Sequence, residues 1–264
     1  MGVNKQFVIA NWKMNMTNSE IERFIGQLKT MPQEMVGKLE IILCPPFVYL
    51  SSTASLLKDT FIKLGAQNIF WEEKGAYTGE ISAQMIKESG CQYLILGHSE
   101  RRKYFCETDE IINKKIKISL KNNLIPIVCI GENLEQKNEG ATKKVIEEQL
   151  LKITRDLSGY EIKKIIIAYE PVWAISTSEE NVEGKADNPE ETQVIHKYIK
   201  KLMGDHYSHE IIKYVNVIYG GSVKQENVAE FARMPDINGL LIGSASLSHF
   251  KFIKIIEEFI KNKF

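Results

Sequence analysis

Three side chains capable of acid–base chemistry, Lys13, His98 and Glu170, each come shortly after a short apolar run. The runs are rich in β-branched residues, as strands buried on both faces are. In α/β folds the carboxyl ends of parallel strands meet at one mouth, so we expect these three side chains to lie together. An ammonium group, an imidazole and a carboxylate around one mouth suit proton abstraction next to a carbonyl group. Singly, each also fits a structural role: a solvated lysine, a turn histidine, a surface ion pair.

Two glycine-containing loops in the last third of the chain suit a phosphate group. They are Tyr219-Gly220-Gly221-Ser222-Val223 and Ile242-Gly243-Ser244-Ala245, and each follows an apolar run. Backbone amides beside glycine approach an anion closely. Residues 222–225 also have the capping-box pattern of a helix start, whose dipole would add to the attraction. A single Gly-Gly pair is often only a turn, but two such loops in succession predict a phosphate site.

A repeating scaffold must position these residues. Eight short apolar runs alternate with longer segments of helical spacing, which predicts an α/β fold, a closed (β/α)8 barrel of eight parallel strands surrounded by helices. The expected strands are 7–10, 39–43, 61–66, 93–96, 124–129, 165–168, 214–219 and 239–242. The length of 264 residues suits a single barrel domain over residues 1–264.

Helix starts are predicted where side chains satisfy free backbone amides. Thr17 to Glu20 has the capping-box pattern, and Asn188-Pro189 places a proline at a first helical position. Residues 133–157 predict an amphipathic helix that is broken near Gly140. The pair Lys114-Lys115 is interpreted as a solvated helix face.

Composition excludes several function classes. Lysine plus arginine and aspartate plus glutamate both total 34, so no net charge favours nucleic acid or an acidic membrane. No apolar run approaches the roughly 20 residues of a membrane span, and the first residues lack a signal-peptide core, so we expect a cytoplasmic protein. The cysteines are scattered without a Cys-x-x-Cys pair, which predicts reduced thiols and no metal site.

Six motifs, in order along nearly the whole chain, closely resemble those of triosephosphate isomerases. They are Asn11-Trp12-Lys13-Met14-Asn15, Thr78-Gly79-Glu80-Ile81-Ser82, Leu96-Gly97-His98-Ser99-Glu100-Arg101-Arg102, Cys129-Ile130-Gly131-Glu132, Ala168-Tyr169-Glu170-Pro171-Val172-Trp173-Ala174-Ile175 and Tyr219-Gly220-Gly221-Ser222-Val223. The resemblance implies a TIM barrel that interconverts dihydroxyacetone phosphate and glyceraldehyde 3-phosphate in glycolysis and gluconeogenesis. It implies no metal and no organic cofactor.

The resemblance also implies a role for each matching residue. Glu170 would be the base, and His98 would polarise the carbonyl oxygens as a neutral imidazole. Lys13, aided by the Asn11 amide, would stabilise the enediolate, with the Glu100 carboxylate near Lys13. The remaining implied contacts are Ser99 as a partner of Glu170 in the empty site and amides near Ser176, Ser222, Gly243 and Ser244 for the phosphate.

Two departures from the family pattern concern the lid and the last loop. The lid would begin at Pro171, Val172 and Trp173 and end at Gly184, Lys185 and Ala186, over a stretch longer than is usual in the family. We expect this insertion to bulge outward and slow closure without abolishing catalysis. Ser244 stands where the family often has glycine, and it keeps the backbone amide provided its φ is negative.

A homodimer is the expected assembly. The connection of residues 68–80 is long, and in the resembling family it reaches the neighbouring subunit, where the threonine matching Thr78 touches the residues matching Asn11 and Lys13. Met14 would pack beside this interface. Nucleic acid and membrane partners are not expected.

Two other functions stay open. The first is another phosphate-binding barrel, such as an aldolase or an epimerase, although neither a lysine deep in a strand nor a strand-end His/Asp cluster is present. The second is a catalytically weakened barrel that binds a partner through the extended lid, residues 176–186. The intact set of Lys13, His98 and Glu170 favours the isomerase over both.

Overall fold

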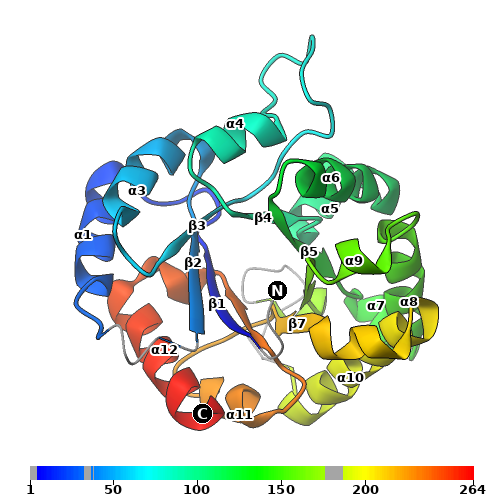
Figure 1. Ribbon diagram of the computed structural model, residues 1–264. Helices are drawn as coiled ribbons and strands as arrows, with labels where there is room; N and C mark the ends of the chain where they lie inside the picture. Colours follow the sequence, from blue (N-terminus) through cyan, green and yellow to red (C-terminus); the bar gives the residue numbers. More distant parts are fainter. Residues whose placement is uncertain (1–4, 33–36, 38, 176–186) are drawn as a thin grey trace.

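The computed structural model describes residues 5–32, 37, 39–175 and 187–264, and its strands form a closed parallel barrel (Figure 1). Strands pair in chain order, and β8 closes the barrel against β1, with Phe7 opposite Gly239. The strands are β1 (Gln6–Asn11), β2 (Leu39–Cys44), β3 (Lys63–Ala66), β4 (Tyr93–Leu96), β5 (Ile125–Ile130), β6 (Ile166–Tyr169), β7 (Asn216–Tyr219) and β8 (Gly239–Ile242). The predicted (β/α)8 barrel is confirmed.

Helices surround the strands (Figure 1). The α-helices are α1 (Asn18–Leu28), α3 (Leu50–Leu57), α4 (Ala83–Glu88), α5 (Ser99–Phe105), α6 (Asp109–Lys121), α7 (Leu134–Asn138), α8 (Thr142–Ile153), α9 (Gly159–Ile162), α10 (Pro189–His206), α11 (Val228–Arg233) and α12 (His249–Lys263). Short 3-10 helices are η1 (Phe47–Tyr49), η2 (Val172–Ala174), η3 (His209–Tyr214) and η4 (Ser244–Leu247).

The strands are apolar on both faces because both faces are covered. In β1, Phe7 and Ile9 belong to a cluster inside the barrel, whereas Val8 and Ala10 belong to the larger cluster between strands and helices. Successive strand residues point to opposite faces, so one strand supplies both cores. This is why the strands read as continuous apolar runs.

Three predicted helix boundaries are confirmed. Thr17 forms a capping box with Glu20 at the start of α1, and the Asn188 side chain accepts amide hydrogen bonds at the start of α10. The break between α7 and α8 falls where predicted, because Gly140 adopts φ +69°.

Two other predictions are wrong. No helix begins at Ser222, whose N–H donates to Ala174 O and whose carbonyl accepts from Asn227 Nδ2. The capping-box pattern is therefore used for loop contacts, and α11 starts only at Val228. Lys115 is not solvated: it is buried, and its Nζ lies 2.5 Å from Glu107 Oε1 and 2.7 Å from Asn68 Oδ1.

The remaining expectations concern thiols and membranes. Cys44, Cys91 and Cys129 are buried free thiols and Cys106 is an exposed one. Across the described ranges, no helix combines the length and apolar character needed to span a membrane.

Candidate active site

Four of the predicted site residues line one small pocket at the carboxyl end of the barrel. Asn11 is the last residue of β1, Lys13 follows it in the next loop, His98 follows β4 and Glu170 follows β6. The same pocket is lined by Gly243 and by other residues of the loops after β7 and β8. The sequence therefore brings an amide, a cation, an imidazole and a carboxylate together through strand ends alone.

Glu170 is held in place mainly by its backbone. It is 2% exposed, and its N–H donates to Ile130 O at 2.8 Å. Its carboxylate makes looser contacts: Oε2 accepts from the Ser99 backbone N–H at 3.4 Å, and Oε1 lies 3.5 Å from His98 Nε2. Ser99 thus contacts Glu170 through its amide, where the sequence resemblance had suggested only a partner of unspecified type.

Two glycines make room for Glu170, and the sequence analysis did not assign them this role. A Cβ on Gly131 would lie 1.9 Å from Glu170 O, and a Cβ on Gly220 would lie 2.6 Å from Glu170 Cγ. Neither distance is tolerated, so the backbone and side chain of Glu170 both require a glycine beside them. Gly220 therefore sits beside the carboxylate as well as in the predicted phosphate loop.

His98 caps α5 with its ring. Its Nδ1 accepts the Glu100 backbone N–H at 3.2 Å, whereas Glu100 Oε2 lies 3.6 Å from the same nitrogen, beyond hydrogen-bond range. Because Nδ1 is an acceptor, the neutral ring carries its hydrogen on Nε2. That N–H faces Glu170 and the pocket, so His98 is arranged as a neutral donor.

Lys13 reaches the pocket from an unusual backbone conformation. Its φ is +52°, in the left-handed region that lysine rarely adopts. The loop is held by Asn11 Oδ1, which accepts the Lys13 N–H at 3.1 Å, and by Gln67 Nε2, which donates to Lys13 O at 2.8 Å. The ammonium group lies 2.7 Å from Glu100 Oε1. The result is a cation whose backbone and charged group are both held in position.

The residues predicted to bind phosphate differ in whether the structure describes them and in whether their backbone amides are already hydrogen-bonded. Gly243 and Ser244 lie where η4 begins, and Ser244 is not among the residues with positive φ, so it fits the loop without strain. Ser222 is 3% exposed and its amide is bonded to Ala174 O at 3.0 Å, so this amide reaches a phosphate only after that bond breaks. Ser176 lies outside the described residues.

The residues at the start of the predicted lid are bonded to Glu132, which the sequence analysis quoted only as part of a motif. Glu132 is fully buried, and its Oε1 accepts from Trp173 Nε1 at 2.9 Å and from Tyr169 Oη at 3.1 Å. Its carbonyl accepts the Val172 N–H, and Pro171 leads into η2 with φ −61°. The other predicted lid residues, Gly184, Lys185 and Ala186, lie outside the described residues.

Asp187, just before α10, is a buried carboxylate that the sequence did not reveal. Its side chain accepts from Asn188 N at 2.8 Å and from Thr192 Oγ1 at 2.9 Å, and its own N–H donates to Tyr219 Oη. Burial raises the pKa of Asp187 to about 6, although both hydrogen bonds and the Lys137 charge oppose the rise.

The two predicted interface residues are exposed. Met14, beside Lys13, is 94% exposed, and Thr78 lies in the β3–α4 connection, which projects away from the barrel (Figure 1). Among the described residues, no three histidine, cysteine, aspartate or glutamate side chains are grouped as metal ligands.

Comparison with known proteins agrees with this arrangement. The family model described as "Triosephosphate isomerase" matches residues 6–259. The chain is 44% identical to proteins named triosephosphate isomerase from Dictyoglomus turgidum, over 96% of this chain and 99% of that protein, and from Chloroherpeton thalassium, over 97% and 99%. Another with this name, from Alkaliphilus oremlandii, is 44% identical over 96% of this chain and 99% of that protein. The chain belongs to the triosephosphate isomerase family.

Proposed function

We propose that this chain interconverts dihydroxyacetone phosphate and D-glyceraldehyde 3-phosphate through an enediolate, as an isomerase of glycolysis and gluconeogenesis in the cytoplasm. The observation that carries the proposal is the single pocket lined by Asn11, Lys13, His98 and Glu170. Proton transfer between adjacent carbons needs one base, and stabilisation of the enediolate needs donors around its oxygens. The residues that line this pocket include a carboxylate, on Glu170, and donors, on Lys13, His98 and Asn11.

Glu170 is the base in this proposal. Its carboxylate removes a proton from the carbon beside the carbonyl group and returns it to the neighbouring carbon. The contacts of the carboxylate with the Ser99 N–H at 3.4 Å and with His98 Nε2 at 3.5 Å are long, so it exchanges them for the substrate at low cost. Burial keeps water away from the carboxylate and so favours its reaction with the carbon acid.

His98 and Lys13 take the charge that develops on oxygen. The Nε2–H of His98 donates to a carbonyl oxygen, and the Lys13 ammonium group and the Asn11 amide stabilise the enediolate. Glu100 acts through Lys13, because it holds the ammonium group at 2.7 Å. The phosphate is assigned to amides at Gly243, Ser244, Ser222 and Ser176.

The lid completes the site in this proposal. Pro171, Val172 and Trp173 form its first hinge, and Gly184, Lys185 and Ala186 its second. The hydrogen bonds that Trp173 Nε1 and the Val172 N–H donate to Glu132 tie the first hinge to the end of β5.

The decisive experiment is a coupled assay of glyceraldehyde 3-phosphate isomerisation by the purified chain. Glu170→Asp retracts the carboxylate by one methylene group and should lower kcat by about 10²-fold or more. Glu230→Asp makes the same change on exposed helix α11 and should leave kcat unchanged. Negligible turnover by the folded chain would contradict the proposal and favour partner binding through residues 176–186.

A homodimer is the proposed assembly. Large exposed apolar side chains occur at Met14 after β1, Val48 in η1, Tyr77 in the projecting β3–α4 connection that carries Thr78, and Met85 in α4. Such side chains favour burial against a second copy. Sedimentation should give a dimer, and Met14→Glu should give a monomer with reduced kcat. Val194→Glu, at an exposed apolar residue of α10, is the matched control and should stay dimeric.

A further inference from the structure

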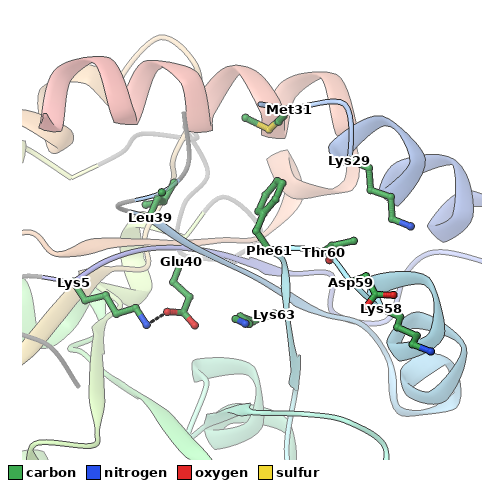
Figure 2. Close-up of a pocket in the computed structure, with 11 residues that line it drawn as sticks. Lys5, Lys29, Met31, Leu39, Glu40, Lys58, Asp59, Thr60, Phe61 and Lys63 are labelled. Carbon is green, nitrogen blue, oxygen red and sulfur yellow. Dashed lines mark ion pairs between the residues drawn. The ribbon is translucent and has the colours of Figure 1, made fainter. Parts of the chain in front are cut away.

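A second pocket opens at the opposite end of the barrel, near the amino-terminal ends of β1, β2 and β3. Its volume is about 880 Å³, within the range of small-molecule sites. Figure 2 shows Lys5, Glu40 and Lys63 at its strand side and Lys29 and Lys58 at its helix side. We call it the lysine pocket.

The lysine pocket has an excess of positive charge in a chain whose net charge is zero. Among the residues that the structure describes, four lysines line it, against two acidic residues, Glu40 and Asp59. Glu40 is already neutralised, because Lys5 pairs with it and Tyr93 Oη donates to its Oε1 at 2.6 Å. Within the part of the chain that the structure describes, the ammonium groups of Lys29, Lys58 and Lys63 form no ion pair.

Two of these charges, on Lys5 and Lys63, act on one another. Burial and the nearby charge of Lys63 both lower the pKa of Lys5. A group of ammonium ions that repel each other is relieved by a multivalent anion, which interacts with several of them at once. Apolar side chains line the same pocket as the lysines: Met31 and Leu39 are buried, and Phe61 is partly exposed.

We propose that the lysine pocket binds a multivalent anion that carries phosphate groups, at a site separate from the triose phosphate site. Lys29, Lys58 and Lys63 contact the phosphates, and the Lys5–Glu40–Tyr93 group forms the fixed strand side of the pocket. The Phe61 ring offers a surface to an organic ligand such as a nucleoside triphosphate. Because the two sites lie at opposite ends of the barrel, an anion bound in the lysine pocket does not compete with the substrate.

Calorimetric titration of the purified chain with inorganic tripolyphosphate tests the proposal. We expect two sites per chain, one at each end of the barrel. Lys58→Gln/Lys63→Gln should weaken one of them by about tenfold or more. Lys144→Gln/Lys197→Gln removes two exposed lysines of α8 and α10 and should change neither site by more than about twofold.

Enzyme kinetics distinguish binding at the triose phosphate site from binding in the lysine pocket. Tripolyphosphate acting at the triose phosphate site inhibits competitively, and the Lys58→Gln/Lys63→Gln variant should retain that inhibition constant and kcat, which also shows that it is folded. A single site per chain, unaffected by Lys58→Gln/Lys63→Gln, would overturn the proposal. Equal weakening in both double variants would overturn it too, because it would indicate general attraction to surface lysines.

A second titration with ATP distinguishes the two sources of phosphate. Tighter binding of ATP than of tripolyphosphate, reduced to the tripolyphosphate level by Phe61→Leu, would assign an organic ligand. Equal binding of both, insensitive to Phe61→Leu, would assign an inorganic polyphosphate.

Discussion

The two ends of the barrel use charge in opposite ways. At the carboxyl end, Lys13 lies against Glu100, His98 Nδ1 accepts a backbone amide and Glu170 is held by its own backbone. At the amino end, the Lys5–Glu40–Tyr93 group is fixed, and the other described lysines of the pocket, Lys29, Lys58 and Lys63, are arranged around its opening. Chemistry needs groups whose positions do not change during the reaction, whereas binding of an anion needs only their charge.

The largest effect should come from removing the proposed base, Glu170, at the carboxyl end. Glu170→Gln should lower kcat by about 10²- to 10⁴-fold, because general base catalysis contributes about that much. At the amino end, Glu40→Gln should leave kcat within about twofold, because its charge is far from the reacting atoms. Steady-state assays of both variants measure this contrast, and a large loss of kcat in Glu40→Gln would show that the two ends are coupled.

Gly220→Ala should give the next largest effect. The new Cβ would lie 2.6 Å from Glu170 Cγ and displace the carboxylate, so kcat should fall by about 10²-fold. Gly26→Ala in α1 is the control, since no atom lies within 4 Å of the position that its new methyl group would take and the helix should gain about 0.5–1 kcal/mol. Unchanged kcat in Gly220→Ala would show that Glu170 does not need this space.

Asp187→Asn should change stability in a pH-dependent way. The Asp187 pKa is about 6 in the folded chain, above its ordinary 3.8, so the folded chain holds this proton more tightly than the unfolded chain. Burial of the carboxylate therefore costs nothing below about pH 4, costs progressively more between pH 4 and 6, and costs about 3 kcal/mol above that.

The variant should accordingly be more stable than the parent at pH 8 and similar at pH 4. Denaturant unfolding at the two pH values measures the difference. A variant that is equally destabilised at both would mean that the hydrogen bonds to Asn188 and Thr192 outweigh the cost of burying the charge.

The smallest effect should come from Tyr93→Phe at the amino end. It removes the 2.6 Å hydrogen bond to buried Glu40 and should lower the free energy of unfolding by about 1–2 kcal/mol. kcat should not change. Thermal unfolding measures the loss of stability, and the coupled assay measures kcat. A loss of kcat in Tyr93→Phe would show that the two ends of the barrel are coupled.

Strand ends and motifs were enough to predict the barrel and to bring Lys13, His98 and Glu170 together. Apolar runs reveal buried strands because both faces are covered, and strand direction then decides which end carries the polar residues. β3 starts at Lys63, later than its apolar run suggests, because pairing with β2 decides where the strand begins.

Contacts between distant segments could not be predicted. Gly131 and Gly220 are needed because a glutamate from another strand end passes beside them. Lys115 is buried because Glu107 and Asn68 meet it from elsewhere in the chain. The lysine pocket combines residues as far apart as Lys5 and Lys63, and no local pattern marks them.

The left-handed backbone of Lys13 limits how this site can be transferred to another barrel by protein design. Its φ of +52° costs roughly 1–2 kcal/mol, and the bonds from Asn11 and Gln67 offset that cost. A designer who grafts only the reacting side chains would let the loop relax and turn the ammonium group away. The graft must include Gln67, which is not one of the residues that line the pocket.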